Sequence, residues 1–482
     1  MTVSGASFRD PAGICQVVEQ RVLRALDAPG ADNLENFLKT PAAREFISRD
    51  QLVSTRRLQQ SEAAAVRELP EWRPLFADRP TAAIFEHERI PFRSYPYEWP
   101  PEMLWEAGRL TLELAQSALA DGYGLKDATP YNVLFRGSQA VFIDVPSFEL
   151  RAAGDPVWQA YGQFVRTFLL PLLVNRHWGV PLADIFRTRR DGLEPHEVYR
   201  LCHPLERFRP LIFSLVSMPT WLSRNARSRG RQLYQSRILP NAEKACFILE
   251  SLLRQLRRSL EAVKPRAHKN SKWMHYMEAN SYSDAALSAK EQFVNESLAA
   301  FKPSQVLDIG ANTGHFSQLA AKTGARVVAI DLDPACVGAV WRRARAQSLD
   351  ILPLAVDIGR PTPALGWRYQ ECVSFLGRAT GAFDGVLMLA VIHHLLVSER
   401  IPLAEILSLA SDLTTSLLII EFVGPDDEMF QQLARGREKL HQTFNQQSFE
   451  EACATHFEIV RKLQLPGGQR WLYCLKKKGA AN

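Results

Sequence analysis

The chain has 482 residues, of which 46% are hydrophobic and 23% charged, as in ordinary globular proteins with room for two or three domains. Its net charge of +6 is modest for this length and does not by itself indicate a polyanionic partner. The seven cysteines are scattered, odd in number and without CxxC spacing, which disfavours a disulfide framework or a zinc site. A polar N-terminus and apolar runs too short to span a bilayer predict a cytoplasmic protein.

The first half predicts an α+β domain over residues 1–240. Residues 84–100 contain three prolines and are expected to be extended. Residues 103–124 carry apolar side chains at helical spacing and end in two glycines, which predicts a helix. Two short apolar runs around an Arg-Gly-Ser turn predict a hairpin over 132–144. The following stretch, 155–263, is expected to be mostly helical.

Three polar residues in this half have a distinctive spacing, because Asn132 follows Asp127 by five residues and Asp144 follows Asn132 by twelve. Residues 84–170 thereby resemble the catalytic and metal loops of protein kinases and aminoglycoside phosphotransferases. The resemblance implies that Asp127 is a general base and that Asn132 and Asp144 are metal ligands. The neighbouring residues depart from that pattern, and no glycine-rich phosphate loop or lysine–glutamate pair is evident upstream. Active phosphotransfer, a kinase-like fold without it, and a coincidence of loop carboxylates all stay open.

Arginines cluster at 187–190 and at 224–237, which indicates either solvated helix faces or contact with an acidic substrate or RNA. Residues 242–263 predict a long helix with a basic face. The polar stretch 264–272 is poor in apolar residues and is expected to be the linker between domains. We therefore place a helix and linker at 241–272 and a second domain at 273–482.

The second domain is organised around residues 306–317, which read VLDIGANTGHFS. Alternating apolar residues, a glycine-containing turn and the start of an amphipathic pattern predict a buried strand, a tight loop and a helix N-terminus. Gly310 and Gly314 permit a ligand to approach the main chain closely. The helix N-terminus offers unpaired N–H groups to polar or anionic atoms.

Strands and helices alternate after this loop, which predicts a doubly wound parallel sheet covered on both faces. The last two strands flank a Pro-Gly-Gly turn, so the sheet is expected to end in an antiparallel hairpin. The expected strands are 306–309, 326–331, 351–356, 383–391, 416–423, 457–465 and 469–477, with helices starting at His315, Pro334, Ile401 and Asp427.

This order of elements resembles the class I S-adenosylmethionine-dependent methyltransferases, which have a seven-stranded sheet ending in a hairpin. The resemblance implies S-adenosyl-L-methionine as cofactor, ribose hydroxyls bound by Asp331, and the adenine amino group bound by Asp357. The loop expected to wrap the methionine part comprises Asp308, Gly310, Ala311, Asn312 and Gly314. Asp308 has a structural alternative as a cap of the loop, and Asp357 as a turn residue. A nicotinamide-dependent dehydrogenase is the main rival, but it would usually show GxGxxG and would not predict the final hairpin.

Ligands of open parallel sheets bind at the carboxyl ends of the strands. His393 and His394 follow the fourth strand, and one of them could act as a general base or orienting donor, or simply pack. Glu421, at the end of the fifth strand, is a second candidate for the acceptor pocket. No metal-ligand cluster is evident in this half. Candidate lid or specificity residues are Trp273, Tyr276, Tyr282, Trp367 and Glu371.

The whole chain is similar to the NoeA-type rhizobial nodulation proteins, a group of two-domain methyltransferase-like proteins. The matching segments are YPYEW, LKDATPYN, FIDVPSFE, GANTGHFS, AVIHHL and EFVGPDD. The resemblance implies a methyltransferase linked to host-specific nodulation whose acceptor is undefined. A small molecule or oligosaccharide is the favoured acceptor, with RNA or protein possible. The alternatives are a non-catalytic cofactor-binding scaffold and a bifunctional enzyme with a kinase-like N-terminal domain.

Overall fold

The computed structural model describes residues 13–18, 20–70, 72, 81–226, 238–266, 283–441 and 443–479. The chain divides into two compact units. Unit 1 comprises residues 1–135, 139–266 and 365–373, and unit 2 comprises 136–138, 267–364 and 374–482. The candidate lid residues Trp273, Tyr276 and Tyr282 lie outside the described residues, as do the arginines between 227 and 237.

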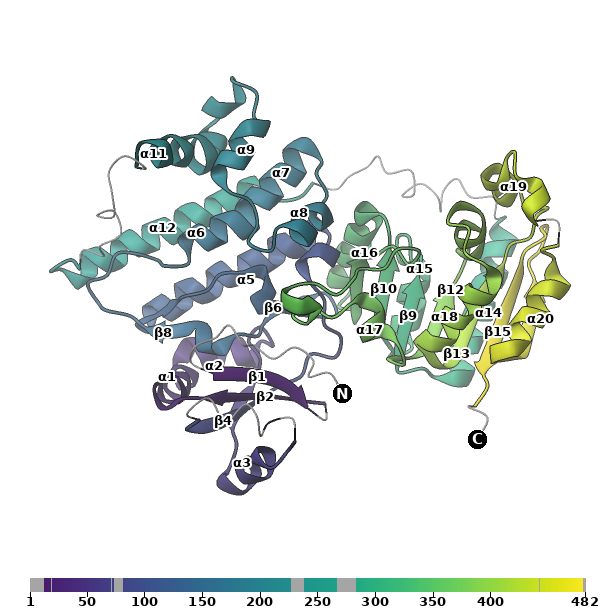
Figure 1. Ribbon diagram of the computed structural model, residues 1–482, viewed down its shortest axis with the longest axis horizontal. Helices are drawn as coiled ribbons and strands as arrows, with labels where there is room; N and C mark the ends of the chain where they lie inside the picture. Colours follow the sequence, from purple (N-terminus) through teal and green to yellow (C-terminus); the bar gives the residue numbers. More distant parts are fainter. Residues whose placement is uncertain are drawn as a thin grey trace. The chain divides into compact units, whose positions relative to one another are not determined.

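Unit 1 begins with a four-stranded antiparallel sheet of order β1-β2-β4-β3 (Figure 1). Opposite residues of an antiparallel pair share a face, and Leu23 and Ile84 on one face pack with Val66 and Trp72 in a small core. The elements are β1 (Gly13–Val18), β2 (Arg21–Leu26), α1 (Ala28–Leu38), α2 (Pro41–Ser48), β3 (Thr55–Arg57), α3 (Gln60–Arg67) and β4 (Ala83–His87).

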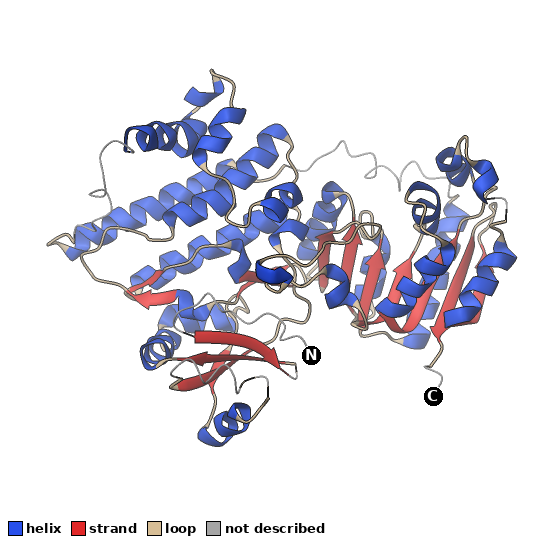
Figure 2. Cartoon of the chain, viewed as in Figure 1, coloured by secondary structure: helices blue, strands red, loops and turns tan. Residues whose placement is uncertain are grey.

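The rest of unit 1 is mainly helical, in agreement with the sequence pattern (Figure 2). Its longest early helix, α5 (Pro101–Ala120), buries most of its apolar residues. The expected hairpin forms from β6 (Val133–Arg136) and β7 (Gln139–Phe142), and β5 (Tyr123–Leu125) pairs with β8 (Phe148–Leu150). The later helices are α6 (Tyr161–Phe164), α7 (Leu170–Trp178), α8 (Leu182–Thr188), α9 (Pro195–Leu201), α10 (Pro210–Ile212), α11 (Met218–Ala226) and α12 (Ala242–Ala262).

Unit 2 contains a seven-stranded sheet of order β11-β10-β9-β12-β13-β15-β14. The first five of these strands are parallel, and β15 runs antiparallel to β13 and β14. The predicted doubly wound sheet with a terminal hairpin is therefore confirmed. The strands are β9 (Gln305–Ile309), β10 (Arg326–Asp331), β11 (Ile351–Ala355), β12 (Phe383–Met388), β13 (Thr414–Phe422), β14 (Phe457–Gln464) and β15 (Trp471–Lys477).

Helices cover both faces of this sheet (Figure 2). They are α14 (Asp284–Phe301), α15 (His315–Lys322), α16 (Pro334–Ala346), α17 (Phe375–Ala379), α18 (Leu403–Leu413), α19 (Glu428–Ala434) and α20 (Gln446–His456). The sequence pattern did not predict α17 or α20. It also extended β12 to residue 391, whereas the strand ends at Met388 because Ala390 has a left-handed backbone with φ of 55°. None of the helices in the described ranges combines the length and apolar character that a membrane span requires.

Candidate functional site

The loop after β9 is shaped by two glycines in the left-handed backbone region. Gly310 has φ of 70°, and a Cβ atom there would lie 2.4 Å from Cγ2 of Val391. Gly314, the N-cap of α15, has φ of 79°, and a Cβ atom would lie 2.9 Å from Cγ2 of Val340. Both positions therefore exclude side chains, and the loop brings its main chain close to the segment after β12.

Asp331, the last residue of β10, is held against this loop by main-chain hydrogen bonds. Its Oδ2 accepts from the backbone N–H of Asn312 at 2.8 Å, and its Oδ1 accepts from that of Asp333 at 2.9 Å. Burial raises the pKa of Asp331 to about 6, while these two hydrogen bonds oppose that increase. The structure thus brings the predicted glycine loop and the predicted acidic residue together.

Asp357 lies beside this pair, just beyond β11. The backbone N–H of Val356 donates to the Asp331 carbonyl at 3.0 Å, so the ends of β10 and β11 are adjacent. Oδ1 of Asp357 accepts from the backbone N–H of Gly359 at 2.9 Å, which is a turn-forming contact. Asp333 caps α16 by accepting from the backbone N–H of Ala335.

Asp308 is almost fully buried within β9 and faces helix α15. Its Oδ2 accepts from the Ser317 hydroxyl at 2.5 Å. Burial raises the pKa of Asp308 to about 6, and the Ser317 hydrogen bond opposes the shift. The contact fixes the start of α15 relative to β9, whereas a role of Asp308 as a cap of the glycine loop stays a prediction.

His393 and His394 follow β12 and begin a single π-helical turn over His394–Ser398. Their rings lie 4.2 Å apart between centroids. His393 is fully buried, and neither of its ring nitrogens has a hydrogen-bond partner in the part of the chain that the structure describes. Burial lowers the pKa of His393 well below its usual value, and His394, Arg470 and Lys290 reinforce the shift. The imidazole is therefore neutral at physiological pH.

Glu421, at the end of β13, belongs to a buried network of ion pairs. Its Oε2 lies 2.6 Å from Nζ of Lys290, and its Oε1 lies 3.6 Å from Nη1 of Arg470. Arg470 also pairs with Asp427, with Nε–Oδ2 at 2.7 Å and Nη2–Oδ1 at 3.2 Å. Asp427 caps α19 through the backbone N–H of Met429. The network joins α14, β13, α19 and the loop before β15.

The sequence reasoning missed Lys290, Arg470 and Asp427 as members of this site. One signal was available for Lys290, because it occupies the apolar face of α14 with Ala286 and Phe293. A charged residue in an apolar stripe is almost never fully buried unless it has a partner. Nothing local marked Arg470, because the sequence pattern placed it inside the expected strand 469–477, whereas it lies in the loop before β15.

Contacts to main-chain carbonyls link the segments that carry the three kinase-like positions, within unit 1. Asn132 donates from Nδ2 to the Asp127 carbonyl at 3.3 Å, and the backbone N–H of Ile143 donates to the Asn132 carbonyl at 2.9 Å. Asp144, next along the chain, forms an ion pair of 2.9 Å with the buried guanidinium of Arg24 from β2. Among the described residues, no group of three or more His, Cys, Asp or Glu side chains is arranged to hold a metal ion.

The insertion between β11 and β12 contains Trp367 and Glu371, which belong to unit 1 rather than to unit 2. Glu371 accepts from the Trp367 backbone N–H at 2.7 Å and pairs with Arg190 at 2.8 Å. The Trp367 side chain is exposed. Their role as lid or specificity residues stays a prediction.

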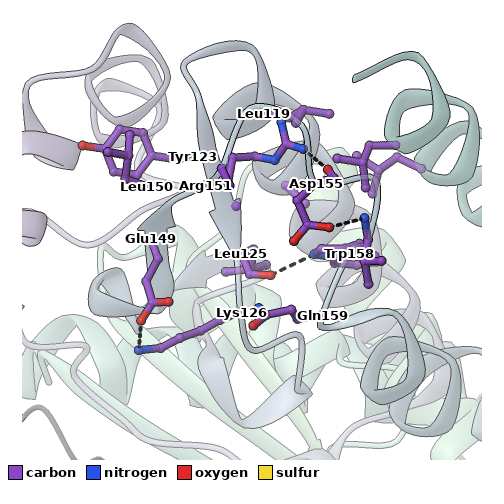
Figure 3. Close-up of a pocket in the computed structure, with 16 residues that line it drawn as sticks. Leu119, Tyr123, Leu125, Lys126, Glu149, Leu150, Arg151, Asp155, Trp158 and Gln159 are labelled. Atoms are coloured by element: carbon purple, nitrogen blue, oxygen red, sulfur yellow. Dashed lines mark hydrogen bonds and ion pairs between the residues drawn. The ribbon is translucent and has the colours of Figure 1, made fainter. Parts of the chain in front are cut away.

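Unit 1 contains a pocket of about 270 Å³ between the β5–β8 pair, α5 and α12 (Figure 3). Apolar residues such as Leu253 form part of its wall, and charged side chains surround it. Lys126 pairs with Glu149 at 2.7 Å, and Arg151 donates to the Asp155 carbonyl. Lys126 and Glu149 are thus paired with each other, and Arg151 is held by a main-chain carbonyl, at the border of this space.

Comparison with known proteins identifies the family. Residues 275–460 match the model of a methyltransferase domain. The chain is 31% identical to the nodulation protein NoeA of Rhizobium meliloti (strain 1021) over 472 residues, covering 98% of this chain and 95% of that protein.

The chain is also similar to solved structures over part of its length. One is the N-methyltransferase NodS from Bradyrhizobium japonicum WM9 in complex with S-adenosyl-L-homocysteine, at 15% identity and a TM-score of 0.31, covering 43% of this chain and 100% of that one. Another is the bifunctional kinase-methyltransferase WbdD, at 20% identity and a TM-score of 0.30, covering 43% of this chain and 42% of that one. On the strength of the full-length relative and the domain match, the chain belongs to the NoeA family, and its C-terminal half is a class I S-adenosylmethionine-dependent methyltransferase domain.

Proposed function

We propose that this protein transfers a methyl group from S-adenosylmethionine to a small-molecule or oligosaccharide acceptor, and that the reaction serves host-specific nodulation. The family membership supports the reaction class, and the nodulation role is supported by the name of the relative, the nodulation protein NoeA. The observation that carries the proposal is the position of Asp331. Its carboxylate is fixed by the Asn312 backbone N–H of the glycine loop, at the carboxyl edge of a methyltransferase-type sheet.

The residues around the loop fit the cofactor. Gly310 and Gly314 leave no room for side chains, which permits close approach to the main chain. Asp331 has its carboxylate fixed by backbone N–H groups and is oriented to accept hydrogen bonds from a ribose diol. Asp357, on the neighbouring strand end, is the candidate for the adenine amino group. When bound, S-adenosylmethionine supplies an activated methyl group on a sulfonium sulfur.

The acceptor side of the proposed site is formed by the residues after β12 and β13. His393 and His394 are the candidates for contact with the acceptor, because they follow the strand next to β9. Glu421 supports this region through its ion pairs with Lys290 and Arg470. We therefore assign Glu421 a positioning role and His393 the direct contact.

For unit 1 we propose acceptor recognition, supported by its pocket between α5 and α12. Phosphotransfer is a second candidate, favoured by the spacing of Asp127, Asn132 and Asp144 and by the hydrogen bond that ties the Asn132 side chain to the Asp127 carbonyl. The ion pair with Arg24 weighs against it, because a guanidinium beside the Asp144 carboxylate competes with a divalent cation.

The proposal is tested by incubating the purified full-length protein with methyl-labelled S-adenosylmethionine and fractionated extract of the source cells. Transfer of label to one fraction is expected, and the Asp331→Asn variant should transfer much less. A protein that binds S-adenosylhomocysteine but labels no fraction would be a cofactor-binding scaffold instead.

A further inference from the structure

The inner wall of the unit 1 pocket is formed mainly by apolar side chains (Figure 3). Leu119 of α5 and Leu249 and Leu253 of α12 line it, and all three are buried. Nε1 of Trp158 donates to the Leu125 carbonyl at 2.8 Å, so the indole directs its only polar atom to the main chain. The wall therefore offers a ligand apolar surface rather than hydrogen-bonding groups.

The charged side chains that line this pocket sum to no net charge. They are Lys126 and Arg151, with Glu149 and Asp155. Lys126 pairs with Glu149 at 2.7 Å, Arg151 donates to the Asp155 carbonyl, and Oδ1 of Asp155 accepts from the Val157 backbone N–H at 2.9 Å. A charged ligand group needs a counter-ion when it leaves water. Because these groups already have partners within the protein, the lining favours an uncharged ligand group.

Two aliphatic side chains at the open side of the pocket are exposed to solvent. Leu150 is 72% exposed and Val157 is 51% exposed, and both line the pocket. A single exposed leucine or valine is common on protein surfaces. Two that border one apolar pocket form a surface whose removal from water by a ligand is favourable.

We infer that this pocket binds an uncharged aliphatic group of the methyl acceptor. The inference rests on the role in acceptor recognition proposed for unit 1, and it adds the chemical class of the group that is recognised. A volume of about 270 Å³ is small for a ligand pocket, since such pockets usually measure about 300–1,000 Å³. The pocket therefore holds one group of a larger molecule, and the aliphatic side chains of its wall match an aliphatic group.

The first test is calorimetric titration of the full-length protein with 1-butanol, 1-hexanol and 1-octanol. Affinity should rise by about fourfold for each added methylene group, with a negative heat-capacity change, because each methylene leaves water for the apolar wall. The uncharged 1-octanol should bind more tightly than octanoate or octylammonium, because the lining provides no counter-ion. An absence of alcohol binding, or tighter binding of a charged analogue, would overturn the inference.

A matched pair of variants locates the binding. Ala152 and Ala153 are both exposed, and Ala152 lines the pocket, whereas Ala153 is not one of its lining residues. Ala152→Trp should weaken 1-octanol binding by about tenfold or more, the equivalent of about two methylene groups excluded from the wall. Ala153→Trp should change it by less than about twofold. Equal affinities in the two variants would place the alcohol elsewhere and overturn the assignment.

The last test uses the labelled product of the full-length protein, methyl-labelled S-adenosylmethionine and fractionated extract. The product should be retained on an octadecyl-silica column because it carries an aliphatic group, and Ala152→Trp should raise the KM for that acceptor by about tenfold. A labelled product that is not retained overturns the inference and leaves methyl transfer intact. An absence of labelled product contradicts the proposed methyl transfer, and the alcohol titration then tests the pocket by itself.

Discussion

Asp331 in unit 2 and Asp144 in unit 1 both stand at the end of a buried strand, but their carboxylates have different partners. Asp331 accepts hydrogen bonds from the backbone N–H groups of Asn312 and Asp333. Asp144 forms an ion pair with the guanidinium of Arg24. Backbone N–H groups orient a carboxylate while leaving its negative charge in place, whereas a guanidinium neutralises it.

The difference shows that the surroundings of a carboxylate decide what it can bind. Asp331 is held by main-chain N–H groups, and burial raises its pKa to about 6 while these hydrogen bonds oppose the shift. Asp144 already has its counter-ion. Glu421 resembles Asp144 because its carboxylate is also paired with cationic side chains, those of Lys290 and Arg470, in a buried network.

The largest effect is expected on stability, from breaking the Glu421 network. Lys290→Met leaves the Glu421 carboxylate buried without its nearest counter-ion and should lower the free energy of unfolding by about 3–5 kcal/mol. Urea unfolding measures the change. Lys290→Met combined with Glu421→Gln removes both charges and should recover most of the loss. A double variant as unstable as the single one would show that the broken ion pair does not cause the loss of stability.

The second effect concerns the affinity for S-adenosylhomocysteine. Asp331→Asn keeps the shape of the side chain but removes its charge, and should weaken binding by about 10- to 100-fold, because hydrogen bonds to charged groups contribute about 1.5–3 kcal/mol. Calorimetry measures the affinity. Asp333→Asn is the matched control, since Asp333 caps α16. Equal losses of affinity in the two variants would show that Asp331 contributes no more to cofactor binding than Asp333 does.

The third effect is the pH dependence of that affinity. Asp331 has a pKa of about 6 in the ligand-free protein, so it takes up a proton as the pH falls through 6 and then accepts fewer hydrogen bonds. Binding of S-adenosylhomocysteine should weaken by about tenfold between pH 7 and pH 5. Asp331→Asn should flatten this dependence, leaving only what Asp308 contributes. A wild-type affinity that is constant over this range would contradict the assignment.

The smallest effect is expected from unit 1. Asp144→Asn should change the affinity for S-adenosylhomocysteine by less than about twofold, because sites without shared partners act independently. The same variant tests the alternative function. Magnesium-dependent ATP binding by the wild type that Asp144→Asn abolishes would establish a nucleotide site despite Arg24.

Local sequence signals predicted much of unit 2. The strands of its sheet are apolar runs bounded by glycine, proline or aspartate, and the end of β10 at Asp331 and the start of α16 at Pro334 both follow from such signals. The end of β12 was harder to predict. The apolar run continues to residue 391, and only the left-handed backbone of Ala390 ends the strand.

Partners distant in sequence could not be predicted. Glu421 and Lys290 are 131 residues apart, and only the folded sheet brings them together. Arg24 likewise looks like an ordinary strand residue until β2 is placed beside Asp144. The sequence could also show that two histidines follow β12, but not that both ring nitrogens of His393 would be buried with no hydrogen-bond partner among the residues that the structure describes.

We propose that the carboxyl edge of the unit 2 sheet binds the methyl donor through the glycine loop and Asp331. Calorimetric titration of the full-length wild-type protein with S-adenosylhomocysteine measures this binding. We expect saturable binding at one site per chain, strongly weakened in Asp331→Asn and unchanged in Asp144→Asn. No binding by the folded wild-type protein, or equal binding by all three proteins, would contradict it.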